Sequence, residues 1–214
     1  MTDSWGEVDL VMTTIITTCL DKEKYFGDLD SVVGDGDFGY SLARGFEKVQ
    51  AQYGELDRTD IGTFLKKVGM LVTSRIGGTS GPIWGTAFLR AGMTAGATTS
   101  LDGAMVVAML RSAVTGIQAR GGAELGDKTL LDAIVPMTDA IEESLASGAS
   151  SDEVVERAAV AARTAADATA ELVAKRGRAA YTGERSRGSV DAGATAVAVI
   201  IEQIAEVWKT RESR

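Results

Sequence analysis

The stretch Asp28-Leu29-Asp30-Ser31-Val32-Val33-Gly34-Asp35-Gly36-Asp37-Phe38-Gly39 places four acidic side chains and three glycines between two apolar helical segments. Oxygen ligands without a nearby His or Cys favour a hard cation such as Mg²⁺ or Ca²⁺. The calcium loop of an EF-hand does not fit, because Gly39 and Phe46 stand where that loop needs Asp/Asn and Glu. Since Mg²⁺ usually binds few protein carboxylates together with phosphate oxygens, the stretch predicts a nucleotide site. A solvated acidic turn is the alternative interpretation.

The chain has 214 residues, which suits a single domain over residues 1–214 with a sizeable core. Its net charge of −8 argues against a general affinity for nucleic acid or anionic lipid. The N-terminal residues are acidic and no apolar run reaches membrane-spanning length, so we expect a cytoplasmic protein with no membrane insertion. The single Cys19 lies in an apolar segment and is expected to be a buried structural thiol. Because the chain has no His, acid–base chemistry falls to Asp, Glu, Lys or a metal-bound water.

Helical periodicity recurs along the whole chain, and no sustained alternation of apolar and polar residues indicates a strand. The pattern predicts an all-α protein with eight helices at residues 5–20, 40–53, 59–76, 82–97, 101–120, 128–146, 151–176 and 193–211. Ser150 and Glu153 form a capping box at the start of the seventh helix. Pro136 should kink the sixth helix.

Four of the seven connections share an unusual composition, in which glycine stands beside polar or charged residues. They are the first, third, fifth and seventh connections, at residues 27–39, 77–81, 121–128 and 177–191. In an up-and-down antiparallel array, alternate connections lie at the same end of the helices. The order of the loops therefore predicts that all four meet at one rim and form a composite site.

Two of these loops have features of phosphate sites. In Gly77-Gly78-Thr79-Ser80-Gly81-Pro82, glycines let backbone N–H groups approach an anion, and the next helix start adds a favourable dipole. A tight turn between helices is the alternative. Residues 121–129 nearly match a P-loop, but Asp127 replaces its Lys and no strand precedes it. Lys128 and Thr129 could still contact phosphate or ribose, or Asp127 and Lys128 could form a solvated cap.

The segment from Lys175 to Gly193 holds four Arg residues in an otherwise acidic chain. Arg binds phosphate oxygens in a forked geometry and stabilises the transition state of phosphoryl transfer. A loop of this length in a compact helical domain is more often functional than idle. A basic surface loop is the alternative interpretation.

Over nearly its whole length the chain resembles the L subunit of bacterial dihydroxyacetone kinases, which is also the C-terminal nucleotide domain of single-chain dihydroxyacetone kinases. The matching motifs are Gly34-Asp35-Gly36-Asp37-x-Gly39, Arg44-Gly45-Phe46, Gly77-Gly78-Thr79-Ser80-Gly81-Pro82, Gly126-Asp127-Lys128-Thr129 and Gly177-Arg178-Ala179-x-Tyr181-x-Gly183-Glu184-Arg185-Ser186.

This resemblance implies an antiparallel up-and-down eight-helix barrel that holds ADP or ATP at one rim. It implies that Asp30, Asp35 and Asp37 hold two Mg²⁺ ions. The nucleotide site that it implies consists of Phe38, Gly39, Tyr40, Ser41, Thr79, Ser80, Gly121, Leu130, Arg178, Asp191, Ala192 and Gly193. Of these, we expect Arg178 to act on the transferring phosphate.

In this family a separate K subunit holds the short ketose through its own His and docks over the nucleotide rim. The present chain has no His. We therefore expect it to transfer a phosphoryl group to dihydroxyacetone on a K subunit, from an ADP coenzyme that a phosphohistidine protein of the phosphotransferase system rephosphorylates. The alternatives are an ATP-dependent kinase subunit, for dihydroxyacetone or another short ketose such as a tetrulose, and a non-catalytic nucleotide-dependent module that binds a regulator. A homodimer is also left open.

Three positions depart from the family pattern. L subunits that work with the phosphotransferase system usually have His at the position of Phe38 and x-Asn at Tyr40-Ser41, and a Pro at the position of Ala192. Because Phe38 cannot donate a side-chain hydrogen bond, these departures concern the phosphoryl donor more than the fold.

Overall fold

The computed structural model describes residues 4–75 and 80–211, and within these residues the chain is built from helices without a strand. The α-helices are α1 (Trp5–Asp21), α2 (Glu23–Asp30), α3 (Phe38–Gln52), α4 (Ile61–Arg75), α5 (Ser80–Ala95), α6 (Gly103–Gly121), α7 (Leu131–Ala146), α8 (Ser151–Ala168) and α9 (Ala192–Thr210). Three 3₁₀ segments accompany them: η1 (Tyr53–Glu55), η2 (Thr169–Glu171) and η3 (Arg178–Ser186). The predicted all-α class is confirmed.

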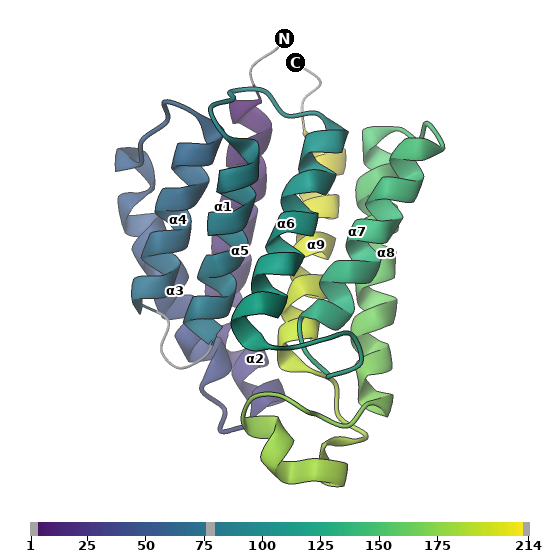
Figure 1. Ribbon diagram of the computed structural model, residues 1–214. Helices are drawn as coiled ribbons and strands as arrows, with labels where there is room; N and C mark the ends of the chain where they lie inside the picture. The colour runs from purple at the N-terminus through teal and green to yellow at the C-terminus, as the bar shows by residue number, and fades with distance from the viewer. Residues whose placement is uncertain (1–3, 76–79, 212–214) are drawn as a thin grey trace.

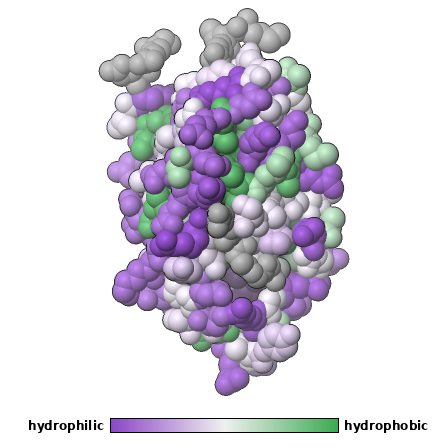
Figure 2. All heavy atoms as spheres, turned by 90° about the vertical axis from the view of Figure 1, so that its left-hand side faces the viewer, coloured by the Kyte–Doolittle hydropathy of each residue, from purple (hydrophilic) through white to green (hydrophobic). Residues whose placement is uncertain are grey.

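The long helices lie side by side and alternate in direction, with short α2 and segment η3 at the lower end of the array (Figure 1). Contacts between them form a closed circuit that runs from α1 to α3, then through each successive helix to α9, and from α9 back to α1. The eight-helix barrel stays a prediction in its detail, because α2 adds a ninth helix to the described part of the chain. Figure 2 shows that hydrophilic side chains cover most of the face on the left of Figure 1, with apolar side chains exposed between them.

Helix α2 corrects the prediction that residues 27–39 form one long loop. Phe26 anchors this helix, because its side chain is fully buried and its ring lies 6.2 Å from that of Phe38. Two glycines allow α2 and the start of α3 to approach closely. A Cβ on Gly39 would lie 2.0 Å from the carbonyl oxygen of Glu23, and one on Gly27 would lie 3.2 Å from that of Gly36. The acidic loop therefore spans only residues 31–37.

Glycines also set the contact between α4 and α5. A Cβ on Gly85 would lie 2.8 Å from the carbonyl oxygen of Gly69, and one on Gly92 would lie 2.7 Å from that of Gly62. These distances are shorter than van der Waals contact, so the two backbones approach as closely as they do only because both helices have glycine along this line. Small residues therefore allow α4 and α5 to pack closely.

Other predicted helix features have mixed outcomes. The capping box of α8 is present, with the Glu153 carboxylate accepting from the Ser150 backbone N–H at 2.8 Å and the Ser150 hydroxyl accepting from that of Glu153. The same helix ends at Ala168 and not near residue 176, because η2 and an extended Leu172 follow it. Pro136 lies within α7, and its kink stays a prediction. Cys19 is buried as predicted, and burial raises the pKa of its thiol. None of the helices in the described part of the chain is long and apolar enough to cross a membrane.

Candidate functional site

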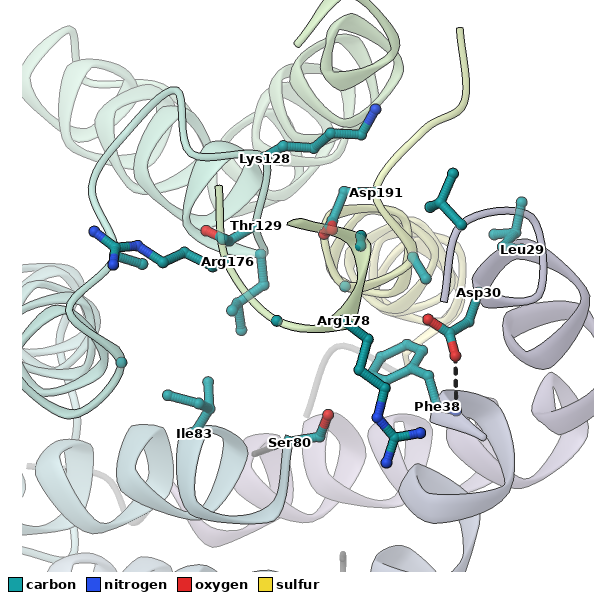
Figure 3. A pocket seen from close by; sticks show the side chains of 18 of the residues that line it. Leu29, Asp30, Phe38, Ser80, Ile83, Lys128, Thr129, Arg176, Arg178 and Asp191 are labelled. Atoms are coloured by element: carbon teal, nitrogen blue, oxygen red, sulfur yellow. Dashed lines mark hydrogen bonds between the residues drawn. The ribbon is translucent and has the colours of Figure 1, made fainter. Parts of the chain in front are cut away.

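A cavity of about 260 Å³ lies at the end of the array where α3, α5, α7 and α9 begin (Figure 3). Its walls include residues from all four predicted loops and from positions next to them, namely Asp30, Asp35, Asp37, Phe38, Ser80, Gly121, Ala123, Lys128, Thr129, Leu130, Arg176, Gly177, Arg178, Asp191, Ala192 and Gly193. The predicted meeting of these segments at one rim is confirmed for the described residues. Each helix start adds partial positive charge and unpaired N–H groups. Four helix starts around one cavity therefore favour an anionic ligand.

The acidic loop brings three carboxylates together on one side of this cavity. Oxygen atoms of Asp30, Asp35 and Asp37 all lie within 4.8 Å of one another. The Asp30 carboxylate accepts hydrogen bonds from the backbone N–H groups of Gly36 at 2.9 Å and Phe38 at 3.4 Å. A Cβ on Gly34 would lie 2.2 Å from Oδ1 of Asp30, so only glycine leaves room for this carboxylate. The loop is therefore folded around Asp30.

This donor set fits Mg²⁺. Three carboxylates supply hard oxygen ligands, and the described residues place no His or Cys among them. Oxygens on opposite sides of an octahedral Mg²⁺ ion are about 4.2 Å apart, so the loop needs only a small closure to bind one ion. The cluster also leaves coordination positions for phosphate oxygens, as expected for a nucleotide site.

Arg178 reaches the same carboxylates from a distant part of the sequence. It is the first residue of η3, and its guanidinium forms ion pairs with Asp35 and, at 3.4 Å, with Asp37. Figure 3 shows this side chain extending into the cavity between Ser80 and Phe38. A phosphate held at the carboxylates by a cation would therefore lie within reach of Arg178, which can donate forked hydrogen bonds to its oxygens.

A second part of the wall is apolar. Ile83 and Trp84 in the first turn of α5 and Ile117 near the end of α6 line the cavity together with Leu130. A Cβ on Gly121 would lie 3.0 Å from Cδ1 of Ile83, so a larger residue there would narrow the space. Of these, the sequence analysis identified only Gly121 and Leu130. The missed positions have a local signal, since each is apolar and lies within one turn of a loop at this rim.

Asp127 and Lys128 contradict the interpretation of a solvated cap, because both residues are buried. Their exposed fractions are 5% and 3%. The Lys128 ammonium donates to the backbone carbonyls of Leu172, Ser186 and Ser189. Figure 3 shows its side chain running away from the cavity. Lys128 and Thr129 both line the cavity, but the Lys128 ammonium is occupied by these carbonyls, whereas the Thr129 side chain stays available for a ligand.

Asp191 caps α9, where its carboxylate accepts from the Ala194 N–H at 2.7 Å. Burial raises the pKa of this carboxyl to about 7, and the nearby Asp132 carboxylate acts in the same direction. Gly193 leaves room for the carboxylate, since a Cβ there would lie 3.0 Å from it. Ala192 and Gly193 thus present the first turn of α9 to the cavity.

Three predicted nucleotide contacts do not line the cavity. Gly39 packs against the backbone of α2, which accounts for its lack of a side chain. The Tyr40 side chain is 56% exposed and its ring lies 5.0 Å from the Arg44 guanidinium, on the outer face of α3. Ser41 donates its N–H to the Asp37 carbonyl within the first turn of this helix. A fourth, Thr79, lies outside the described residues.

Known proteins resemble this chain over most of its length. The model of the DAK2 domain family matches residues 32–206. The "PEP-dependent dihydroxyacetone kinase, ADP-binding subunit DhaL" of Escherichia coli is 38% identical over 194 residues, which cover 89% of this chain and 92% of that protein. The "PTS-dependent" DhaL subunit of Lactococcus lactis is 33% identical over 187 residues, which cover 87% of this chain and 89% of that protein. The L-erythrulose 1-kinase of Mycolicibacterium smegmatis is 36% identical, but this chain spans only 34% of its length.

Solved structures share the fold of this chain. The native dihydroxyacetone kinase of C. freundii has a TM-score of 0.74 and 26% identity, over 92% of this chain and 33% of that chain. Its complex with AMP-PNP and Mg²⁺ has a TM-score of 0.76 at 24% identity, which supports the fold. The fold matches that of a dihydroxyacetone kinase domain, and the chain belongs to the DAK2 domain family. Within that family, its resemblance to the L subunits of dihydroxyacetone kinases is confirmed.

Proposed function

We propose that this chain is the nucleotide-binding subunit of a dihydroxyacetone-type kinase, formed by residues 1–214 as one domain. The observation that carries the proposal is the convergence of Asp30, Asp35, Asp37 and Arg178 at the mouth of a cavity surrounded by four helix starts. Carboxylates for a hard cation, a guanidinium for phosphate and an apolar wall for a base are the components that a Mg²⁺-nucleotide needs.

The three aspartates would hold Mg²⁺, two ions in the form that the family resemblance implies, and the metal would offset the charge of the nucleotide phosphates. The chain's own residues then orient the nucleotide. Ile83, Trp84 and Leu130 offer an apolar surface to its base, while Ser80 at the start of α5 and the first turn of α9 offer N–H groups to its phosphates.

Arg178 would stabilise charge on the transferring phosphoryl group as its bond to the nucleotide breaks and its bond to the ketose hydroxyl forms. Its guanidinium already lies at the carboxylates, so the charge needs little rearrangement during the reaction. The chain has no His, the residue through which the family's K subunit holds its ketose. The substrate is therefore held by a partner, which we take to be a dihydroxyacetone-binding K subunit that docks over this rim.

We infer the phosphoryl donor from the relatives of similar length, because their names specify PEP or the phosphotransferase system. ADP would accordingly stay bound as a coenzyme that a phosphohistidine protein rephosphorylates in place. Phe38 bears on this point, because its ring is buried beside Phe26 and its backbone N–H is directed at Asp30. Neither the ring nor the backbone N–H of Phe38 is available to a phosphate. We therefore infer that retention of ADP depends on the metal and the helix starts.

The test is to purify the chain without added nucleotide, release any bound ligand with acid and identify it. The chain is then combined with a K subunit and dihydroxyacetone, and supplied with either ATP or the PEP-driven phosphotransferase proteins. Retained ADP with turnover only on PEP supports the coenzyme form. Multiple turnovers on free ATP from an initially empty site would replace it by an ATP-dependent kinase subunit. No turnover with either donor would contradict the proposed function.

A further inference from the structure

The Lys128 side chain is buried, and backbone carbonyls accept the hydrogen bonds of its ammonium. Its ammonium donates to the carbonyls of Leu172 at 3.2 Å, Ser186 at 2.5 Å and Ser189 at 2.6 Å. An ammonium has three donors, so these three acceptors use its full capacity. The carbonyls belong to a segment that lies 44 to 61 residues further along the chain. One side chain therefore joins the turn before α7 to both sides of η3.

The backbone conformation of Lys128 indicates that the contacts of its side chain stabilise this turn. With φ of 62°, Lys128 is the only residue other than glycine with positive φ in the described part of the chain. A left-handed conformation is unfavourable for a residue with a Cβ, and glycine would adopt it without that cost. Because a lysine stands there instead, the contacts of its ammonium offset the cost of the backbone conformation.

Asp127 holds the other end of the same segment. Its backbone carbonyl accepts from the Lys175 N–H at 3.1 Å, and its carboxylate accepts from the Arg176 guanidinium at 2.9 Å. The adjacent residues Asp127 and Lys128 thus bind the segment 172–189 at its start and on both sides of η3. Within that segment, Ser186 adds an internal link by accepting from the Ala174 N–H.

We propose that Lys128 is a positioning residue, whose ammonium holds η3 so that Arg178 reaches the carboxylates of Asp35 and Asp37. The inference rests on the proposed function, because it assigns to Lys128 the placement of the residue that acts on phosphate. Lys128 does not contact the reacting groups itself. Burial lowers the pKa of its ammonium, and the nearby Asp191 carboxylate partly opposes that shift. The three carbonyls account for an ammonium in such a buried place.

The experiment compares Lys128→Met with the wild-type chain and with Lys175→Met as a matched control. Lys175 comes from the same rim, but its side chain is 61% exposed and its ammonium makes one ion pair, at 3.2 Å with the buried Asp127 carboxylate. Hydrogen exchange of the backbone amides is measured over residues 172–191 and over α4 and α5. We expect Lys128→Met to accelerate exchange in the first region by about tenfold or more and to leave the second unchanged, because three carbonyls lose their donor.

The second readout is a double-mutant cycle with Arg178→Ala, assayed with a K subunit. If Lys128 acts through Arg178, Lys128→Met should lower kcat by about tenfold or more while changing the affinity for Mg²⁺-ADP by less than about threefold. The double variant should then lie within about twofold of Arg178→Ala alone, because the two effects share one cause. Additive losses would indicate a structural role only and would overturn the inference.

The two hypotheses fail in different ways. If Arg178→Ala retains normal kcat, the role of Arg178 in the proposed function is wrong, while hydrogen exchange still tests whether Lys128 orders η3. If Arg178→Ala is impaired and Lys128→Met exchanges like the wild type, the inference about Lys128 is wrong. Lys128→Gly serves if Lys128→Met does not fold, since glycine accepts the backbone conformation and still removes the ammonium.

Discussion

Asp35→Asn tests the metal assignment with a minimal change in shape. The substitution removes one of the three clustered carboxylates and keeps a side chain of the same size. In the ligand-free chain, the change should alter stability little. The ion pair between Asp35 and Arg178 joins side chains that are 41% and 57% exposed, so its loss costs at most about 1 kcal/mol. Relief of repulsion among the carboxylates acts in the opposite direction.

The effect on the ligand-bound chain should be larger. A ligand present at 100 times its Kd stabilises a folded protein by about 2.7 kcal/mol. For a chain of this size that free energy corresponds to a rise in Tm of about 5–11 °C. Because the carboxylates hold the metal through which the phosphates bind, Asp35→Asn should lose most of this rise at the same concentrations of ADP and Mg²⁺. The Tm of the ligand-free variant should stay within about 4 °C of the wild type.

The assay is thermal unfolding with and without Mg²⁺-ADP, repeated with ADP and a chelator. Asp28→Asn is the matched control. Asp28 lies in the last turn of α2, just before the acidic loop. Its side chain pairs with Lys24 on the surface and does not belong to the carboxylate cluster. The control should keep the full ligand-induced rise in Tm. The reasoning is refuted if Asp35→Asn keeps that rise as well, or if both variants lose it equally.

Three further predictions follow from other parts of the structure. Arg178→Ala should lower turnover with a K subunit by about 10²–10³, as loss of a donor to a charged transition state does, and steady-state kinetics with unchanged Tm would check this. Gly85→Ala should lower the free energy of unfolding by about 1–3 kcal/mol in denaturant titrations, since its Cβ would overlap Thr73 and the α4 backbone. Asp191→Asn keeps a cap acceptor but cannot ionise. Because the folded pKa of Asp191 is raised to about 7, the wild type should lose stability relative to this variant as pH rises from about 4 to 7, and equal pH profiles would contradict the shift.

Helix α2 shows where sequence reasoning fell short. Its eight residues include Gly27 and three acidic side chains, which are weak helix formers or repel one another, so its composition indicates a loop. The helix forms because Phe26 is buried in the core beside Phe38 and because Gly27 and Gly39 let the neighbouring backbones approach. These are contacts between segments, and they override a weak local propensity.

The sequence by itself determined the all-α class and the four loops at one rim, because these depend on local periodicity, composition and the order of the loops. The roles of Asp30, Asp35, Asp37 and Arg178 were predicted from the resemblance to a known family. Only the tertiary structure decided what Lys128 binds. Its partners are backbone carbonyls 44 to 61 residues away, and every residue has a carbonyl, so no residue type marks the acceptors. The location of a buried charge is fixed by which acceptors the folded chain brings to it.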